Sequence, residues 1–336
     1  TSHLERVFPR ERRSPEMHIE GDPEVLKNLF RKKDLLQRRD SRHQEIKPLL
    51  LIGHGAQRGV FGGAQAIALE RAGLSDAFDT VVGVSAGAPT AAYFLAGQSA
   101  LGTSIYYEEC ASKRFISKRR YFWGERIMNT GYLCDVMRGN ESNKKLDIRA
   151  LRASRPEAFA VATHKEGGHG VFLDMKRSVD PVEIIHASIA VPGVASNGVE
   201  IADELYLDGG ASPLPVSDVI DEFHPTDILI LANRSEDGEF WSTLMEYLFE
   251  EPFLTGLPEV THNKFSKKQR EKAFKDALTF IRSQSGCRMA ILWTDDKIRS
   301  STQNRQKLRS AAQRSFRYLT KLLKEAKREV KAEAKS

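Results

Sequence analysis

Two short apolar segments, each followed by a glycine-containing turn and a helical pattern, constrain the fold of this chain most strongly. Residues 49–52 are all aliphatic and lead into a turn over 53–59 that contains Gly53, Gly55 and Gly59. Residues 80–84 are rich in β-branched side chains and lead into a second glycine-containing turn. Helical patterns follow the two turns, at 60–72 and 86–96. Strands that alternate with helices predict an α/β sheet covered by helices on both faces.

The alternation continues along the chain and predicts one large domain with extensions. Further strands are predicted at 158–163, 171–175, 205–207, 227–232 and 288–293, and helices at 181–191, 241–249 and 267–284. The aromatic and cationic stretch 101–145 is expected to be a helical insert. We expect a charged helical N-terminal arm outside the core (1–46), the α/β domain (47–296) and a basic amphipathic C-terminal helix (297–336).

Charge and cysteine content narrow the possible environments. The net charge of +6 is compatible with nucleic acid, an anionic membrane surface or no charged partner at all, but no nucleic-acid-binding motif is present, so we expect no nucleic acid. The three cysteines are far apart, without zinc spacing, which favours a reducing, cytoplasmic location and no metal or cofactor. No apolar run approaches the roughly 18 residues of a membrane span.

Residues 83–87 read Gly-Val-Ser-Ala-Gly and match the GxSxG pattern between a predicted strand and a predicted helix. A sharp strand-to-helix turn pushes the serine hydroxyl out of the sheet, and small neighbours leave room for a substrate. Ser85 would also lie at a helix N-terminus, whose partial positive charge favours developing negative charge. The pattern therefore predicts a nucleophilic serine.

The turn over 53–59 presents backbone N–H groups and can bind an anion. It fits neither the phosphate loop of nucleotide-binding proteins, since no Lys-Ser/Thr follows Gly59, nor the dinucleotide fingerprint, whose third glycine position holds Arg58. A binding site for the oxyanion of an acyl-transfer intermediate remains. The third motif, Asp-Gly-Gly at 208–210, places a carboxylate after a predicted strand, where Asp208 could act as the base that a serine nucleophile needs.

The order of a glycine-rich loop, GxSxG and Asp-Gly-Gly resembles the patatin-like phospholipase family, including its bacterial members. The segment His-Ala-Ser-Ile-Ala-Val-Pro-Gly at 186–193 adds to the likeness, which covers about 48–235. The resemblance implies a three-layer α/β/α fold with a largely parallel sheet. It also implies a lipid acyl hydrolase of phospholipase A or lysophospholipase type that needs no calcium and uses a Ser–Asp dyad without histidine.

Carried over to this sequence, the resemblance makes Ser85 the nucleophile and Asp208 the base. The backbone at Gly55 and Ala56 would supply the oxyanion donors, and Arg58 matches the basic position of the family's loop. That loop usually begins Gly-Gly-Gly, and here His54 and Ala56 replace the first and third glycines. These changes put the loop geometry and the width of the pocket in question.

Two alternatives remain open at the level of sequence. An α/β-hydrolase esterase would need a Ser–Asp–His triad, for which His224 and His262 are the candidates after Asp208. A non-catalytic membrane-binding protein could also use a hydrolase scaffold. The substrate's head group, chain length and positional preference, and the oligomeric state, do not follow from the sequence.

The C-terminal helix has an apolar stripe at helical spacing among many cations. Its apolar members are Leu308, Ala312, Phe316, Leu319, Leu322 and Leu323. Two hypotheses fit this pattern: the helix lies in an anionic membrane interface, or the stripe packs on the α/β core and the cations are solvated. The cationic stretch 114–123 is a second candidate for peripheral contact with an anionic membrane.

Overall fold

The computed structural model describes residues 16–212, 214–236, 254, 256–283, 286–295 and 297–335. The strands are β1 (His18–Gly21), β2 (Pro48–Ile52), β3 (Thr80–Val84), β4 (Glu157–His164), β5 (Gly170–Asp174), β6 (Val199–Ile201), β7 (Glu204–Asp208), β8 (Asp227–Leu231) and β9 (Arg288–Trp293). The α-helices are α1 (Glu24–Gln37), α2 (Gly59–Arg71), α3 (Gly87–Leu95), α4 (Ser99–Glu108), α5 (Thr130–Arg138), α6 (Ile148–Ala153), α7 (Pro181–Ser188), α8 (Val216–Phe223), α11 (Glu259–Phe265), α12 (Lys267–Ser283) and α13 (Arg305–Glu333).

The strands form one twisted sheet in the order β1-β9-β8-β2-β3-β4-β7-β6, and β5 pairs with β4 off this path. The central strands β9, β8, β2, β3 and β4 are parallel, whereas β1, β5, β6 and β7 pair antiparallel with their neighbours. The carboxyl ends of β2 and β3 therefore lie side by side at one edge of the sheet, which is where open α/β sheets bind ligands.

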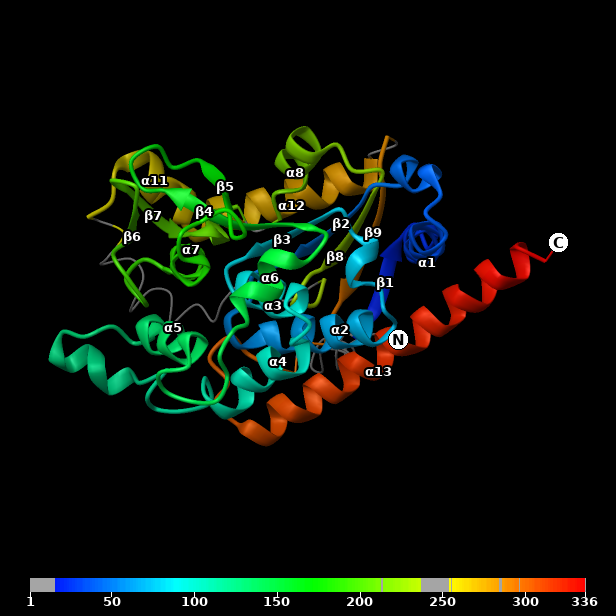
Figure 1. Ribbon diagram of the computed structural model, residues 1–336. Coiled ribbons are helices and arrows are strands. Elements are labelled where there is room, and N and C mark those ends of the chain that lie inside the picture. Colours follow the sequence, from blue (N-terminus) through cyan, green and yellow to red (C-terminus); the bar gives the residue numbers. More distant parts are fainter. Residues whose placement is uncertain are drawn as a thin grey trace, which may run out of the picture.

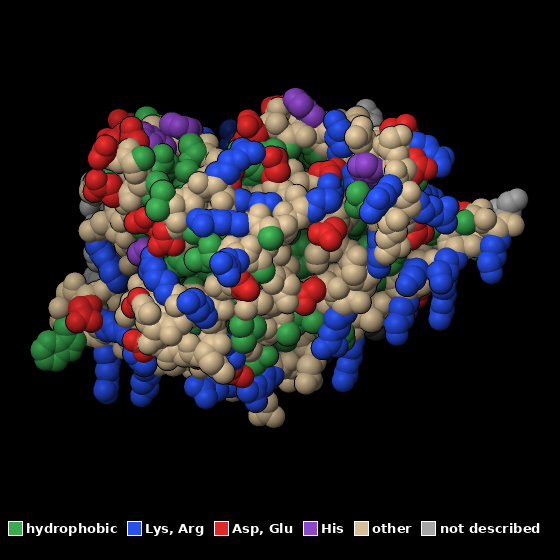
Figure 2. All heavy atoms as spheres, in the orientation of Figure 1, with side chains coloured by type: hydrophobic (Ala, Val, Ile, Leu, Met, Phe, Trp, Pro, Cys, Tyr) green, Lys and Arg blue, Asp and Glu red, His purple; other side chains and the backbone are tan. Residues whose placement is uncertain are grey.

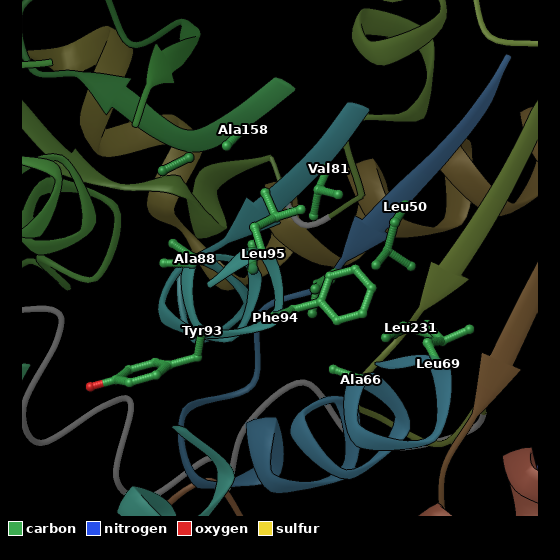
Figure 3. Close-up of a cluster of buried hydrophobic side chains, with 14 of the residues drawn as sticks. Leu50, Ala66, Leu69, Val81, Ala88, Tyr93, Phe94, Leu95, Ala158 and Leu231 are labelled. Carbon is green, nitrogen blue, oxygen red and sulfur yellow. The ribbon is translucent and has the colours of Figure 1, made fainter. Parts of the chain in front are cut away.

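Helices cover both faces of the sheet, so the fold has three α/β/α layers (Figure 1). Along β2 the side chains alternate: Leu50 and Ile52 pack against α1, α2, α3 and α13, whereas Leu49 and Leu51 face α8 and α12. Figure 3 shows the first of these layers, with Phe94 of α3 reaching between the strands and α2. Strands buried on both faces explain why β2, β3 and β8 are almost wholly apolar.

The predicted largely parallel α/β sheet is confirmed, and the strands predicted from the sequence lie within one residue of their observed bounds. The predicted insert 101–145 includes most of α4, which begins two residues earlier at Ser99, and the whole of α5. The helix predicted near 241–249 lies outside the described residues. Helix α13 begins later than predicted, at Arg305, because the side chain of Asn304 caps it by accepting the Lys307 N–H at 2.9 Å.

The N-terminal segment differs from the expected arm outside the core. In its described part, β1 pairs antiparallel with β9 and extends the sheet by one strand. Val25, Leu26, Leu29 and Phe30 of α1 are buried in the core. The weak apolar period that the sequence shows in α1 is thus a packing face, which many neighbouring cations obscure in the sequence.

The apolar stripe of α13 packs on the α/β core. Leu308 and Leu319 are fully buried, and the helix contacts α2, α4 and α1 (Figure 1). The buried hydroxyl of Ser315 donates a 3.0 Å hydrogen bond to the Phe61 carbonyl of α2, which fixes the contact. Since this face is covered by protein, it is not available for insertion into a membrane. Within the described residues, no helix combines the length and the hydropathy that a transmembrane span requires.

This packing predicts that α13 contributes to stability. Leu319→Ala should lower the free energy of unfolding by about 2–5 kcal/mol, because the substitution leaves a cavity in the core. Lys324→Ala, on the exposed face of the same helix, should change it by about 0.5 kcal/mol or less. Denaturant unfolding of both variants measures these effects, and equal values for the two would contradict the packing.

Candidate active site

Ser85 lies in a strained turn between β3 and α3. Its backbone φ is 52°, in the left-handed region that residues other than glycine rarely adopt. The flanking glycines are required by space: a Cβ on Gly87 would lie 2.1 Å from the Ile52 carbonyl oxygen, and one on Gly83 would lie 2.5 Å from the Ala88 Cα. The GxSxG pattern thus forms the sharp turn that the sequence predicts, and the surrounding packing maintains its strain.

Asp208 reaches the same position from β7, a strand that runs antiparallel to its neighbour β4. Asp208 is the last residue of β7. Because β7 is antiparallel to β4, its carboxyl end points toward the opposite edge of the sheet from the carboxyl ends of the parallel strands. However, β7 overlaps only the last residues of β4, and Asp208 pairs with Ala162. Since Val84 pairs with Val161, this short overlap sets Asp208 level with Ser85.

Ser85 and Asp208 are directly hydrogen-bonded. The Ser85 Oγ donates to Asp208 Oδ2 at 2.6 Å, and both residues are buried. The other carboxylate oxygen accepts the Gly210 N–H at 2.6 Å, which explains the Asp-Gly-Gly sequence because a turn must bring that N–H back. Ser188 positions the serine backbone, since its hydroxyl accepts the Ser85 N–H at 3.0 Å and donates to the Val161 carbonyl at 2.6 Å.

Burial is the main cause of the raised pKa of Asp208, which is about 6. Desolvation disfavours the carboxylate, whereas the hydrogen bonds from Ser85 and Gly210 and the positive charge of Arg270 favour it. The net result is a carboxyl group that is ionised at neutral pH and yet more basic than an exposed aspartate. A base with a pKa near the working pH is suited to proton transfer.

The glycine loop lies beside Ser85. Gly55, Ala56 and Ser85 line one cavity together with Arg58. Ala56 has a φ of 48°, so it adopts the conformation that a glycine would favour, and the replacement seen in the sequence leaves the turn in place. In the described part of the chain, no protein acceptor takes up the N–H groups of Gly55 and Ala56. These groups remain available to an oxyanion.

Asn233, directly after β8, holds this loop in position. Its Nδ2 donates to the Gly53 carbonyl at 2.6 Å, and its Oδ1 accepts the Gly62 N–H at 2.8 Å. The side chain is fully buried. Asn233 is not among the residues predicted for the site, although an asparagine at the carboxyl end of a central strand is a signal for such a role.

Ser85 lines two cavities, one almost wholly apolar and one in which charged and apolar side chains are mixed. One has a volume of about 60 Å³ and is lined mainly by apolar side chains from α3, α4, α5 and the segment between α4 and α5, including Tyr93, Ile105, Phe115, Met128 and Leu133. The other has a volume of about 20 Å³ and contains Asp208, His54, Arg58 and Arg270. An ester bond at Ser85 would therefore have an apolar part on one side and a polar part on the other.

The structure does not bring the two candidate triad histidines to this site. His224 ends α8 before β8, His262 lies in α11, and neither lines a cavity that Ser85 lines. His54 does line the polar cavity, but the sequence analysis did not consider it as a base. Its burial and the charges of Arg58, Arg270 and Arg234 hold the pKa of His54 well below its usual value, which keeps the ring neutral.

One group of side chains in the described residues has the spacing of a metal site, and it lies elsewhere. It consists of His18, Glu20 and Glu236. Glu20 already accepts hydrogen bonds from Arg282 at 2.7 Å and from the Trp293 indole at 2.8 Å. These contacts give the group a structural role in joining β1 to β9 and α12.

The raised pKa of Asp208 predicts a pH-dependent effect on stability. Because the pKa rises from 3.8 to about 6 on folding, the folded protein retains a proton that the unfolded chain releases, and this contribution to stability is lost as pH rises from about 4 to 6. Asp208→Asn cannot ionise. Relative to the wild type, the variant should therefore be more stable at pH 8 than at pH 4, with a difference of about 2–3 kcal/mol in the free energy of unfolding. Denaturant unfolding of both proteins at pH 4 and pH 8 tests this prediction. It would be contradicted if the unfolding free energies of variant and wild type differed by the same amount at both pH values.

Comparison with known proteins agrees with the motifs of the site. The sequence profile of the family described as patatin-like phospholipase matches residues 55–220, which include Ser85 and Asp208. The uncharacterized protein YjjU of Escherichia coli (strain K12) is 23% identical over 240 residues, which cover 70% of this chain and 65% of YjjU, just under two thirds of its length.

A solved structure with some similarity is that of VipD from Legionella pneumophila, with a TM-score of 0.42 and 12% sequence identity. The alignment covers 97% of this chain and 73% of VipD. A likeness at this level carries no argument about this chain. The family profile includes the GxSxG and Asp-Gly-Gly motifs and the glycine loop from Gly55 onward. Through residues 55–220, the chain belongs to the patatin-like phospholipase family.

Proposed function

We propose that this protein is a serine lipid acyl hydrolase of phospholipase A or lysophospholipase type, in which Ser85 is the nucleophile and Asp208 its base. The family acts on lipid esters. The observation that carries the finer proposal is the 2.6 Å hydrogen bond from Ser85 Oγ to Asp208 Oδ2, at a strained turn that opens onto an apolar cavity. The expected reducing, cytoplasmic location belongs to the same proposal, supported by three buried free cysteines.

In the proposed reaction, Asp208 accepts the hydroxyl proton as Ser85 Oγ attacks the ester carbonyl. The N–H groups of Gly55 and Ala56 stabilise the negative charge that develops on the carbonyl oxygen. The bond to the alcohol then breaks, and the alcohol leaves with the proton from Asp208. Water attacks the acyl-Ser85 ester, gives a proton to Asp208 and releases the fatty acid, and the proton returns to Ser85.

The apolar cavity supports an acyl ester as the substrate. It lies directly beside Ser85 and Ala86, and its walls come mainly from α3, α4 and residues 115–133. The fatty acyl chain of the ester would enter here, because burial of its methylene groups is favourable by about 0.8 kcal/mol each. The predicted insert 101–145 thus supplies part of the wall of the acyl cavity.

The alternatives have less support at this site. A Ser–Asp–His triad requires a histidine on the serine hydroxyl, and that hydroxyl donates to Asp208 instead. A non-catalytic scaffold was motivated by His54 and Ala56 in the loop, but Ala56 keeps a glycine-like conformation and the loop N–H groups remain accessible to the cavity.

The proposal predicts a loss of activity that depends on two residues. Ser85→Ala and Asp208→Asn should each lower the hydrolysis of a p-nitrophenyl ester by several orders of magnitude, since they remove the nucleophile and its base. His224→Ala and His262→Ala should retain most activity and serve as controls. If a folded histidine variant is as inactive as Ser85→Ala, a triad replaces the dyad.

We also propose that the enzyme meets its substrate at an anionic membrane surface through the projection over residues 116–128. An isolated β-bridge between Ile116 and Met128 closes the base of this projection, and Met128 lines the acyl cavity. Phe122 and Trp123 at its tip are 85% and 84% exposed. Large aromatic side chains at this exposure, beside cations, are typical of membrane-contacting segments.

Charge on the same side of the molecule favours an anionic surface. The start of α13 is joined to the base of the projection, because Gln303 donates to the Ile116 carbonyl at 2.7 Å. From there the exposed face of α13 carries Arg305, Lys307, Arg309, Arg317, Lys321, Lys324, Lys327, Arg328 and Lys331. Figure 2 shows Lys and Arg side chains along this lower edge, with an apolar tip at its left end. The cations of α13, rather than its apolar stripe, would contact the lipid.

This proposal predicts separate effects on membrane binding and turnover. Exchange of Phe122 and Trp123 for serine should weaken binding to vesicles that contain phosphatidylglycerol by at least about 10-fold, because two aromatic side chains lose their insertion. Hydrolysis of a soluble ester should persist. Val179→Ser removes another exposed apolar side chain, 99% exposed, and should leave vesicle binding unchanged. Sedimentation with vesicles measures both, and unaltered binding of the double variant would contradict the proposal.

A further inference from the structure

The apolar cavity at Ser85 runs along one side of α3. Its lining residues on this helix and at its N-cap are Ala86, Pro89, Thr90 and Tyr93. Their spacing in the sequence places the four side chains in one row on the helix. Because the row begins directly after Ser85 and covers two helical turns, the cavity extends for roughly 10 Å from the proposed nucleophile to Tyr93.

The facing wall of the cavity comes from α4, which runs in the opposite direction. The Tyr106 hydroxyl donates to the Ala86 carbonyl at 2.9 Å, next to the nucleophile. Gly102, one turn earlier in α4, packs against Tyr93, since a Cβ at Gly102 would lie 2.5 Å from the Tyr93 Cγ. Both α4 residues line the cavity. Tyr106 therefore marks the end near the nucleophile, whereas Gly102 and Tyr93 lie at the far end.

Tyr93 is held in place at this far end. The residue is 1% exposed, and its hydroxyl donates to the backbone carbonyl of Lys144. Lys144 is itself joined to α4, because its Nζ donates to the Ser104 hydroxyl at 2.7 Å and lies 2.6 Å from a Glu108 carboxylate oxygen. Figure 3 shows Tyr93 pointing away from the strands, whereas the neighbouring Phe94 points toward them. The ring of Tyr93 is therefore part of the core and closes this end of the cavity.

The volume of the cavity limits the length of the acyl chain that it can enclose. This volume is about 60 Å³. One water-sized group occupies about 10–15 Å³ of such a volume, so the cavity holds about four to six groups of this size. A methylene group is about as large as a water molecule. Together with the ester carbonyl carbon, an acyl chain of about five to seven carbons fits between Ser85 and Tyr93, and the long chains of ordinary membrane lipids do not.

We propose that Tyr93 is a specificity-determining residue, which ends the acyl site and restricts the enzyme to esters of short acyl chains of about six carbons. This inference rests on the proposed function and names the substrate class of the same site. The proposed contact with a membrane is compatible with this limit, because a glycerolipid can carry one long and one short acyl chain. Its long chain would stay in the bilayer, while the short chain enters the apolar cavity and is cleaved at Ser85.

Two soluble substrates of different length test the proposal: p-nitrophenyl hexanoate and p-nitrophenyl decanoate, both used as monomers at pH 8. The wild type should prefer hexanoate by at least about 10-fold in kcat/KM, because methylene groups that exceed a closed apolar pocket are rejected. Tyr93→Ala opens the far end, so the ratio of the decanoate value to the hexanoate value should rise by at least about 10-fold. Tyr93→Leu keeps more of the packing, should raise the ratio in the same direction, and provides the test if Tyr93→Ala does not fold.

Two control variants separate the length of the cavity from a general loss of packing. Tyr93→Phe keeps the ring and removes only the hydrogen bond to Lys144, so the ratio of the two kcat/KM values should stay the same. Phe94→Leu trims a buried aromatic side chain on the opposite side of α3, which does not line the cavity, and should also keep the ratio. The proposal would be overturned by a wild type that hydrolyses decanoate as well as hexanoate, by an unchanged ratio in both Tyr93→Ala and Tyr93→Leu, or by an equal change of the ratio in Phe94→Leu.

A third arm uses a lipid in a membrane. Vesicles are prepared from phosphatidylglycerol that carries one hexadecanoyl and one hexanoyl chain, and the released fatty acids are identified by mass spectrometry. Both positional isomers of this lipid are used, so that a preference for one ester position is not mistaken for a preference in length. The wild type should release hexanoate from at least one isomer and hexadecanoate from neither. Equal release of both acids would overturn the proposal.

Calorimetry in the Ser85→Ala background measures binding without turnover and distinguishes the two possible failures. There, p-nitrophenyl hexanoate should bind more tightly than p-nitrophenyl decanoate, and Tyr93→Ala should reverse this order. Binding in this order without hydrolysis by the wild type would contradict the proposed function and support the limit that Tyr93 sets. Hydrolysis of both esters with equal efficiency would support the proposed function and contradict the limit.

Discussion

The hydrogen bond between Ser85 and Asp208 depends on two strands of opposite direction that end at the same level. Ser85 follows β3 in a turn with a φ of 52°, and Asp208 ends β7, which overlaps only the last residues of β4. A longer overlap would carry Asp208 past the serine toward the other edge of the sheet. Thr163 fixes the overlap, because its hydroxyl donates to the Asp208 carbonyl at 2.8 Å. The geometry of the site is therefore a consequence of strand register.

Much of this architecture follows from local pattern, and the rest depends on contacts between distant segments. The alternation of apolar strands with helices and the glycines of the two turns identify the sheet and Ser85, because both signals lie within a few residues. The antiparallel direction of β7 and the position of Arg270 depend on contacts between segments that are far apart in the sequence. A local hydrophobic period does not contain this information. The burial of α1 is a similar case: its cations dominate the composition, while four apolar side chains determine where it packs.

Buried arginines lie near Ser85, and their positive charge affects the protonation of the neighbouring side chains. Burial and the charges of Arg58, Arg270 and Arg234 lower the pKa of His54 and keep it neutral. The charge of Arg270 also favours the ionised form of Asp208 against the cost of its burial. The same cations line or surround the side of Ser85 that faces away from the apolar cavity. An ester at Ser85 would meet apolar side chains on one side and charged side chains on the other, and Asp208 acquires its pKa from the same surroundings.

The central claim is that Asp208 activates Ser85 without a histidine, and the rate of labelling by a fluorophosphonate as a function of pH tests it most directly. The account predicts covalent modification at Ser85 alone, identified by peptide mass spectrometry. Its rate should rise with pH to a plateau with a midpoint near the pKa of Asp208, about 6, and His54→Ala should still be labelled. Labelling at another residue, a rate independent of pH between 5 and 8, or complete loss of labelling in a folded histidine variant would contradict the claim.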